Sequence, residues 1–502
     1  MEIRCSTTAH LDANVDLLAI TLTGNGDLPE AATDLDANLG GSLTRALERS
    51  YLSATKASSH RVSGGESGPR EVLLVSLGTR PADEAERLRV AGATAASTAR
   101  SLKASSVAVL APADDSGTAA AALVEGFVLG LYRYHPYRSS TGEEAVPPAE
   151  EASSDTPPAL TILGDPERLD HGIQAAATVA DATNWARDLA NTPGNDMTPE
   201  LLAAEARELA AAHEHLSLRV IDRAGLEELG AGLLLAVGQG SAHEPRMLVL
   251  EWNPPGATEA DDERLALVGK AVTFDTGGIS IKPSAGMAAM RLDKAGGCAV
   301  LGGMRAIAEL GIERRVLAIV PAAENMPGAR AFKPGDVFTG LSGTTVEITN
   351  TDAEGRLILA DAIAYARELG CARIVELSTL TGATAFFFGP EYAACIAHEG
   401  DLQDAVLSAA RQTGDQAWPL PMDEAYRPAI KSDIADLVNS GPRIAGALYA
   451  GLFLQQFAKD TPFVHLDIAG SGMLDKPRRY HRDPGASGWG VRLLARLAAS
   501  QD

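Results

Sequence analysis

Charged residues that could do chemistry are concentrated in a short connection, NTDAEGRL, at residues 350–357. Asp352, Glu354 and Arg356 occupy alternate positions there, between a strand-like segment and an apolar helical one. If the connection is extended, its side-chain period of two places all three charged groups on the same side. Two carboxylates held together repel each other and resist ionisation unless a cation lies between them. The pattern therefore favours a bound metal ion.

A second charged cluster lies upstream, at residues 265–297. Lys270 stands inside the nearly continuous apolar strand LALVGKAVTF, which delivers Asp275 at its end, and Lys282 and Asp293 follow after a glycine turn. A charged residue inside an apolar strand needs a partner. The carboxylates of the two clusters are the candidates for that partner.

The chemistry of such a site follows from its donor atoms. The candidate ligands are Asp275, Asp293, Asp352 and Glu354. This set is hard and rich in oxygen, which suits Mn, Mg or Zn ions, and four carboxylates suit two ions about 3.5–4 Å apart with a bridging water. A neutral Lys270 amine could complete one coordination sphere, since two dications would lower its pKa. Lys282 and Arg356 could then stabilise an oxyanion or orient a base.

Each charged residue also has a purely structural explanation. Lys270 alone is more often salt-bridged than a ligand, Asp293 could cap the helix after it, and Glu354 could cap a solvated turn. Asp361, inside the helix predicted over 357–369, is expected to be structural. Only the combination of both clusters favours a metal site over these separate explanations.

The elements that must position these residues alternate between strands and helices. Predicted strands occupy 71–78, 105–112 and 159–164 in the first third, and 315–324, 373–383 and 463–470 in the remainder. Segments with helical periodicity lie between them. This alternation predicts an α/β fold.

The chain of 502 residues is long enough for two domains. We expect a smaller N-terminal α/β domain over 1–168, a connecting helix over 169–190, and a larger C-terminal α/β domain over 191–502. The larger domain carries both charged clusters and is expected to have a central mixed sheet flanked by helices. The Pro/Glu/Ser-rich stretch 137–159 is expected to be a surface loop of the first domain, because the strand 159–164 follows it directly.

Composition excludes several classes of protein. The 66 acidic and 43 basic residues give a net charge of -23, which repels nucleic acid and anionic membranes. No apolar run approaches the length of a membrane span, and the N-terminus lacks the pattern of a secretory signal. The four cysteines have no paired spacing, which indicates a reducing compartment. We expect a cytoplasmic protein without membrane association.

Several motifs together resemble a known family. NTDAEGRL, GKAVTFDTGGISIK and ENMPGARAFKPGD are similar to signatures of the leucyl aminopeptidase (cytosol aminopeptidase) family of di-metal exopeptidases. The similarity continues through LSTLTGA at 377–383, SDIADLVNSG at 432–441 and HLDIAGSG at 465–472. It covers roughly 185–490 closely and the first domain weakly, and it is far more specific than one short motif.

The resemblance implies a role for each charged residue. Asp275 and Glu354 would bridge two metal ions, and Asp352 would complete one of the two sites. Lys270 and Asp293 would complete the other site, which also binds the free α-amine of the substrate. The second metal of the family is exchangeable, so Zn, Mn or Mg is expected.

The resemblance also implies how a peptide would be cleaved. Lys282 would polarise the scissile carbonyl, and Arg356 would hold a bicarbonate ion that acts as general base towards the bridging water. The implied substrate-binding residues are Met290, Thr379, Leu380, Gly382 and Ala469. An apolar pocket separates similar aliphatic side chains by only about 1–3 kcal/mol, so a broad preference for Leu and other apolar residues is expected.

The family further implies a homo-hexamer and a role in intracellular peptide and protein turnover. One departure is Lys294, which occupies a position that is usually Met in the family. This difference leaves the substrate preference and the exchangeable metal site open.

Three alternatives differ from a peptidase in class. A DNA-binding regulatory role is disfavoured by the net charge of -23. A di-metal phosphoesterase would need more cations near the metals than Lys282, Lys294 and Arg356. An inactive homologue is disfavoured because every proposed ligand is present.

Overall fold

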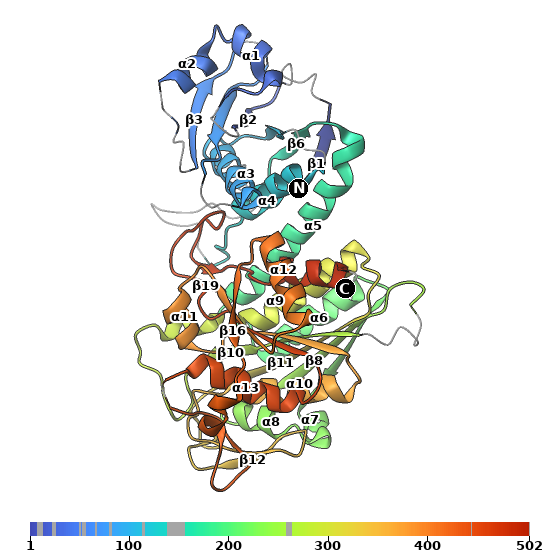
Figure 1. Cartoon of the computed structure of the whole chain (residues 1–502), viewed down its shortest axis with the longest axis vertical. Helices are drawn as coiled ribbons and strands as arrows, with labels where there is room; N and C mark the ends of the chain where they lie inside the picture. Colours follow the sequence, from blue (N-terminus) through green and yellow to red (C-terminus); the bar gives the residue numbers. More distant parts are fainter. Residues whose placement is uncertain are drawn as a thin grey trace. The chain divides into compact units, whose positions relative to one another are not determined.

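The computed structural model describes residues 1–7, 14–22, 27–49, 52, 57–65, 68–79, 83–112, 116–137, 156–257, 264–442 and 444–500. Most of the predicted surface loop, residues 138–155, lies outside these ranges. By its contacts the chain divides into two compact units (Figure 1). Unit 1 contains Met1–Asp181 with Pro477–Asp483, and unit 2 contains Ala182–Lys476 with Pro484–Asp502. Both units are α/β structures, which confirms the predicted fold class.

Unit 1 is built on a six-stranded sheet. Its strands, in spatial order, are β1 (Ile3–Ser6), β6 (Ala159–Leu163), β5 (Ser106–Leu110), β2 (Leu17–Leu22), β4 (Glu71–Ser76) and β3 (Ser58–Ser63). All neighbours pair in parallel except β3, which is antiparallel to β4. The strands predicted at 71–78, 105–112 and 159–164 are therefore present as β4, β5 and β6.

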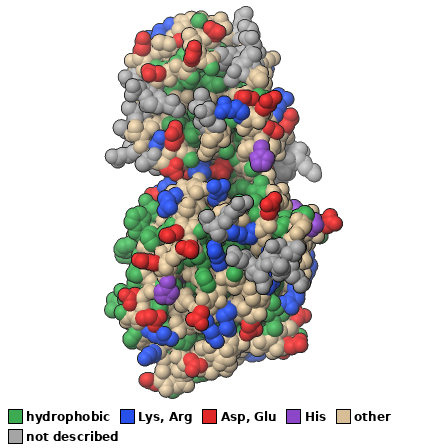
Figure 2. Space-filling model, turned by 45° about the vertical axis from the view of Figure 1, so that its right-hand side comes forward, with side chains coloured by type: hydrophobic (Ala, Val, Ile, Leu, Met, Phe, Trp, Pro, Cys, Tyr) green, Lys and Arg blue, Asp and Glu red, His purple; other side chains and the backbone are tan. Residues whose placement is uncertain are grey.

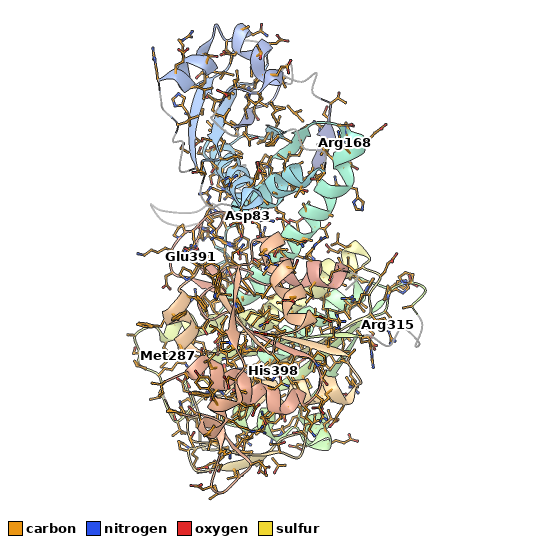
Figure 3. The ribbon with its side chains drawn as sticks, in the orientation of Figure 1. Asp83, Arg168, Met287, Arg315, Glu391 and His398 are labelled. Atoms are coloured by element: carbon orange, nitrogen blue, oxygen red, sulfur yellow. The ribbon has the colours of Figure 1, made fainter. Side chains whose placement is uncertain are left out.

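Helices cover both faces of this sheet. One apolar cluster joins the sheet to α3 (Glu84–Ser101) and α4 (Thr118–Leu131), and another joins it to α1 (Thr33–Asn38) and α2 (Ser42–Glu48). Asp83, labelled in Figure 3, caps α3 by accepting a hydrogen bond from the Ala85 N–H at 2.9 Å. Asp, Ser and Thr are favoured at this position because a helix begins with unpaired N–H groups.

The helix α5 spans Pro166–Asn191, and the division between the units falls inside it. From the sequence, all of 191–502 is expected to belong to the second domain. In the structure the segment Pro477–Asp483 groups with unit 1 instead. Contacts that no local pattern reveals hold it there, since Arg479 pairs with Glu86 of α3 at 2.8 Å and Tyr480 belongs to an apolar cluster of unit 1.

Unit 2 is built on a nine-stranded sheet. The spatial order is β16 (Ala417–Pro421), β15 (Ala393–Ala397), β18 (Phe463–Asp467), β14 (Arg373–Ser378), β9 (Leu265–Gly269), β11 (Val316–Asn325), β8 (Arg246–Trp252) and β7 (Leu216–Ile221), with β10 (Ala271–Asp275) also paired to β11. The four central strands β18, β14, β9 and β11 are parallel, whereas β15, β8 and β7 introduce antiparallel pairs. The predicted central mixed sheet is confirmed.

Lys270 interrupts what the sequence predicts as one strand. Strands β9 and β10 both pair with the ten-residue β11, and Lys270 lies between them. Its backbone remains hydrogen-bonded, because its N–H donates to the Leu377 carbonyl at 3.1 Å and its carbonyl accepts from the Gly297 N–H at 2.6 Å. The break therefore leaves no unpaired backbone group at Lys270.

Helices cover both faces of the larger sheet as well (Figure 1). On one face lie α9 (Ala295–Leu310), α12 (Asp401–Thr413) and α14 (Val491–Ala499), and on the other lie α8 (Gly232–Gly238), α10 (Gly355–Glu368) and α13 (Gly446–Ala458). The remaining helices are α6 (Pro199–Ala211), α7 (Arg223–Leu229) and α11 (Gly382–Phe388), with 3-10 turns η2 (Glu30–Ala32), η3 (Met287–Leu292) and η4 (Glu424–Ile430). Small sheets are formed by β12 (Val337–Thr339), β13 (Thr345–Glu347) and β17 (Leu437–Val438), and by β19 (Met473–Leu474) and β20 (Gly485–Ala486).

Two surface properties agree with the composition. Across the described part of the chain, no helix combines the length and the apolar character that crossing a bilayer would require. On the face drawn in Figure 2, acidic and basic side chains are interspersed among the described residues rather than gathered by sign.

Candidate active site

Three buried carboxylates converge at one end of the larger sheet. Asp275 is the last residue of β10, Asp293 follows η3, and Glu354 directly precedes α10. One oxygen from each lies within 4.8 Å of the others. Residues that are up to 79 positions apart in the sequence therefore share one small, water-excluded volume.

Two lysines lie between these acids. The Lys270 ammonium is 2.8 Å from Asp293 Oδ2 and 2.9 Å from Glu354 Oε1. The Lys282 ammonium is 2.7 Å from Asp275 Oδ2 and is also paired with Asp352. The positive charges are thus positioned between pairs of carboxylates, where like charges would otherwise repel.

The connection NTDAEGRL is not extended, so the argument from a period of two is wrong. Residues 351–352 form a turn, and Glu354 is already helical, with φ −78° and ψ −35°. Residues two apart in a helix point in nearly opposite directions. Glu354 accordingly reaches Lys270, whereas Arg356 reaches the Asn439 carbonyl.

Gly355 makes the close approach of Lys270 possible. A Cβ atom at this position would lie 2.6 Å from Lys270 Cε and 2.7 Å from its Nζ. Any larger residue would displace the Lys270 amine from the carboxylates, which is a steric explanation for the glycine at this position of the motif.

Arg356 is buried with one donor available. Its Nη1 donates to the Asn439 carbonyl at 2.8 Å, and its guanidinium carbon lies 5.4 Å from the centre of the Tyr449 ring. Its Nε has no hydrogen-bond partner among the described residues. Burial lowers the pKa of Arg356, although the neighbouring Tyr449 and Glu354 oppose this shift. A buried guanidinium N–H without a partner suits a small anion.

Two buried polar residues, one that holds the cluster and one that holds the segment beside it, were not predicted from the sequence. Asn325, at the end of β11, donates through Nδ2 to Asp275 Oδ1 at 2.8 Å and to the Thr351 carbonyl at 3.0 Å. Asp467, at the end of β18, accepts from the Thr381 and Thr384 hydroxyls at 2.6 and 2.8 Å. Their signal was available in the sequence, because each is a polar residue at the end of an apolar strand inside a quoted motif.

The predicted substrate-binding residues lie on three segments of the chain, at 290, 379–382 and 469. Thr379 donates through Oγ1 to Asp293 Oδ1 at 2.6 Å, and its carbonyl accepts from Lys270 Nζ at 3.3 Å. The N–H groups of Leu380 and Ala469 both donate to Asp467 Oδ1, at 3.2 and 3.1 Å.

The other two predicted residues occupy neighbouring elements. Met290 lies half-buried in η3, three residues before Asp293, and Gly382 is the exposed first residue of α11. Figure 3 labels Met287, the first residue of the same η3 turn. Both elements are therefore attached directly to segments that form the cluster.

The electrostatics of the cluster are dominated by burial. Burial, reinforced by Glu354, raises the pKa of Asp275 to about 6, and burial raises the pKa of Asp293 to about 7 despite Lys270. Burial alone would raise the pKa of Glu354, but Lys270 and Lys282 hold it below its ordinary value. The carboxylates in turn hold the pKa of both lysines above normal, against the effect of burial. Protons, ammonium groups and metal ions thus compete for the same oxygens.

The donor set fits divalent cations. The donor oxygens belong to buried carboxylates, and the ammonium groups of Lys270 and Lys282 already contact them. A hard site of this type suits Mn, Mg or Zn ions. Of the five predicted ligands, the structure brings Asp275, Asp293 and Glu354 together with Lys270 beside two of them, and Asp352 joins this group through its pair with Lys282.

Lys294, the departure from the family pattern, is completely buried. Its ammonium donates to the Thr192 carbonyl at 2.8 Å and to the Arg291 carbonyl at 2.5 Å. Burial lowers the pKa of Lys294 to about 8. The side chain therefore contacts backbone rather than solvent or a substrate pocket.

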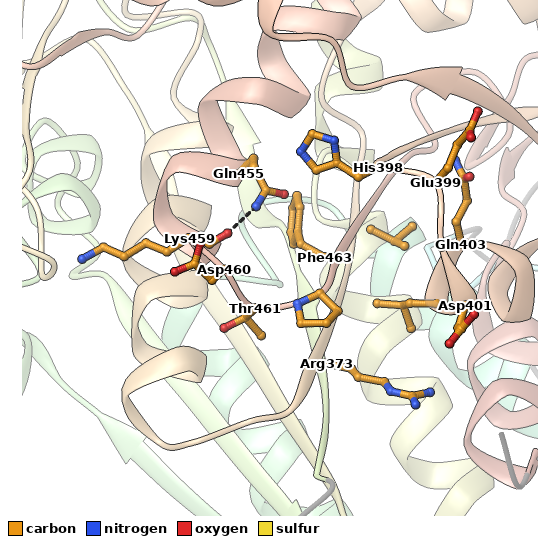
Figure 4. A pocket seen from close by; sticks show the side chains of 14 residues that line it. Arg373, His398, Glu399, Asp401, Gln403, Gln455, Lys459, Asp460, Thr461 and Phe463 are labelled. Carbon is orange, nitrogen blue, oxygen red and sulfur yellow. Dashed lines mark hydrogen bonds between the residues drawn. The ribbon is translucent and has the colours of Figure 1, made fainter.

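A separate cavity of about 480 Å³ lies at the other end of the same strands (Figure 4). Arg373 and Phe463, which begin β14 and β18, line it, and Gln455 Nε2 donates to the Lys459 carbonyl at its edge at 2.6 Å. None of the predicted site residues lines this cavity, so it is distinct from the carboxylate cluster.

Fold and cluster together define a class: a two-unit α/β protein with a group of buried carboxylates, able to hold divalent metals, at one end of a mixed sheet. The catalytic-domain signature of the cytosol aminopeptidase family matches residues 184–495, and its N-terminal-domain signature matches residues 19–141. The chain belongs to the cytosol aminopeptidase family, as its motifs predict. It is therefore a hydrolase with aminopeptidase chemistry.

Individual relatives agree with this assignment. A probable cytosol aminopeptidase of Solibacter usitatus is 42% identical over 96% of this chain and 95% of its own length, and one of Roseiflexus castenholzii is 43% identical over 85% and 86%. Among solved structures, a mutant of tomato leucine aminopeptidase is 32% identical with a TM-score of 0.87, covering 99% of this chain and 96% of its own. The bottromycin maturation enzyme BotP in complex with Mn is 34% identical with a TM-score of 0.81, covering 97% and 99%.

Proposed function

We propose that the protein removes the N-terminal residue of peptides by hydrolysis at two divalent ions, with a preference for Leu and other apolar residues. The observation that carries this proposal is the convergence of Asp275, Asp293 and Glu354 within 4.8 Å, with Lys270 between two of them. When bound, the ions would supply an activated water between them and would anchor the α-amine of the substrate. An anchored chain end allows only the first peptide bond to reach the reacting position.

Lys282 is proposed to stabilise the negative charge that develops on the scissile carbonyl oxygen. This role requires a charged ammonium, and Asp275 raises the pKa of Lys282 against the effect of burial. The side chain is also less buried than Lys270, since 19% of it is exposed compared with 4%. It is therefore the cation of the cluster that a substrate can reach.

Arg356 is proposed to hold a bicarbonate ion that acts as general base. Support comes from its buried Nε, which has no hydrogen-bond partner in the described structure. A planar guanidinium matches the geometry of a planar, oxygen-rich anion.

The substrate preference is proposed to come from an apolar pocket with contributions from Met290 and Ala469. Thr379, Leu380 and Gly382 would contact the peptide. Because apolar pockets separate similar side chains by about 1–3 kcal/mol, a ranking among aliphatic residues is expected rather than strict selection.

The metal at each site, the assembly and the location are proposed on the same basis. The structure of BotP with Mn supports manganese, with zinc as the alternative and magnesium at the exchangeable site. A homo-hexamer, a cytoplasmic location and a role in peptide and protein turnover extend the family resemblance, and the name of the relatives, cytosol aminopeptidase, supports the location.

Metal analysis paired with a substrate panel tests this function. We expect the purified protein to bind two divalent ions per chain and to hydrolyse Leu-p-nitroanilide faster than charged aminoacyl analogues. Chelation should abolish the activity and Mn²⁺ should restore it. Full activity after complete removal of metal, or faster cleavage of p-nitrophenyl phosphate, would contradict the proposal. A salt-sensitive gel shift with DNA would instead support a regulatory role.

A further inference from the structure

A buried lysine next to the carboxylate cluster has no part in the function proposed above. Lys294 directly follows Asp293 and is the N-cap residue immediately before α9. It ranks among the largest side chains that are fully buried in the described structure. Burying an ammonium group is costly, so its position calls for a compensating role.

Both hydrogen bonds of its ammonium go to main-chain carbonyls. Arg291, in η3, accepts at 2.5 Å, and Thr192, just after the end of α5, accepts at 2.8 Å. None of the ion pairs found among the described residues includes Lys294. The side chain therefore joins two segments of backbone that are 99 residues apart in the sequence and does not neutralise an acid.

The segment that it holds carries a proposed metal ligand. Asp293 lies between Arg291, which accepts the bond, and Lys294, which donates it. The Asp293 carboxylate contacts Lys270 at 2.8 Å and Thr379 at 2.6 Å, so its direction depends on the backbone of this turn. A main-chain carbonyl at the end of a 3-10 turn, such as that of Arg291, lacks a hydrogen-bond donor within the turn. The Lys294 ammonium supplies that donor.

We propose that Lys294 is a positioning residue that fixes the η3–α9 turn against the segment after α5 and so aims Asp293 into the metal site. This inference rests on the proposed function and extends it to a residue outside the ligand set. A methionine at this position could fill a similar volume but could donate no hydrogen bond.

The test is the substitution Lys294→Met in the full-length protein, with Mn²⁺ binding to the metal-free form as the readout. Residues that orient metal ligands typically change metal affinity by about 10–100-fold when removed. We expect a loss of about tenfold or more at one of the two ions and little change at the other. Activity at saturating Mn²⁺ should largely recover, so the effect appears in metal affinity rather than in kcat.

A matched control separates positioning from general destabilisation. Arg492→Met also replaces a buried cation by methionine in unit 2, but it removes a pair with Asp415 between α12 and α14. We expect it to lower Tm without altering the ratio of the two Mn²⁺ affinities. Lys294→Gln, which retains two N–H donors on a shorter side chain, should give an affinity between those of the wild type and Lys294→Met.

The outcomes are distinguishable. Wild-type affinity at both ions in Lys294→Met would overturn the inference while leaving the proposed function intact, as would an equal loss in Arg492→Met. If Lys294→Met fails to fold, Lys294→Leu takes its place, and wild-type affinities at both ions in that variant would also overturn the inference. Failure of the unaltered protein to bind Mn²⁺ would overturn the proposed function, and the inference with it.

Discussion

At the scale of single residues, the site is a compact arrangement of opposite charges that burial makes strong. Lys270 and Lys282 each lie between two carboxylates and are not interchangeable, because only Lys282 has substantial exposure. Burial strengthens each attraction and each repulsion by excluding water. Changes to single charges are therefore expected to separate metal binding from catalysis.

Glu354→Ala and Lys282→Ala should fail in different ways. Glu354→Ala removes the carboxylate that Lys270 contacts at 2.9 Å and is expected to abolish both metal binding and turnover. Lys282→Ala should leave the metals bound but lower kcat by about 10²–10³, since it removes a donor to the developing oxyanion. Metal content and kcat measured on both variants check this. Normal turnover in Lys282→Ala would mean that another group stabilises the carbonyl oxygen.

Metal affinity should depend on pH. The pKa of Asp293 is raised to about 7 and that of Asp275 to about 6, so both carboxyls hold protons at higher pH than usual. A metal ion requires the ionised form, so affinity should rise with pH through this window and protons should be released on binding. Calorimetric titration with Mn²⁺ at about pH 6 and about pH 8, in buffers of different ionisation enthalpy, measures both quantities. A constant affinity between these values would contradict the assignment.

At the scale of elements, the site depends on where regular structure stops. Strand β9 ends before Lys270 and β10 begins after it, and α10 begins at Gly355. These two interruptions allow the Lys270 amine to reach Glu354. The glycine is required by contact, because a Cβ there would meet the end of the lysine side chain.

Gly355→Ala should therefore impair the site more than the fold. The lysine tip is flexible and can move aside, so the stability cost is expected to be small, but the amine would leave its place beside Glu354. We expect Tm within a few degrees of the wild type and a loss of metal affinity of about 10–100-fold. Gly172→Ala, in α5 with open space around the added Cβ, is the matched control and should leave affinity unchanged. Equal affinities in both variants would show that Lys270 is not needed for binding.

At the scale of the whole molecule, chain order and spatial grouping differ. The segment Pro477–Asp483 comes late in the sequence but groups with unit 1. Its Arg479 pairs with Glu86, which is only 2% exposed and also contacts Arg89 at 3.3 Å. A buried carboxylate shared by two arginines is expected to matter for unit 1 alone.

Glu86→Ala should destabilise unit 1 locally. Removing one partner from a buried ion pair typically costs about 3–5 kcal/mol. We expect the lower end here, because Arg89 keeps its pair with Glu125 at 2.5 Å and Arg479 is partly exposed. Hydrogen exchange should accelerate in α3 and in 477–483 and stay unchanged in the strands of the larger sheet. Glu227→Ala, which removes an exposed pair with Arg223, serves as control and should cost less than about 1 kcal/mol. Uniform acceleration across both units would contradict a local role.

The sequence was sufficient for the family, the fold class, the type of most elements and the residues brought together at the site. These depend on local periodicity and on motif residues, which remain visible in one dimension. The prediction that NTDAEGRL is extended was wrong, because α10 begins inside this segment. Asn325 and Asp467 were also not predicted, because their roles depend on partners in distant segments.

Only the tertiary structure decided how these residues meet. The spatial order of β18, β14, β9 and β11 brings strand ends together that are far apart along the chain. The same order helps to bring Asp275, Asp293 and Glu354 into one small volume. Side-chain period is a property of neighbours along the chain, whereas strand order is set by burial of apolar faces over the whole unit. For this reason the residues of the site could be named from the sequence, but their contacts could not.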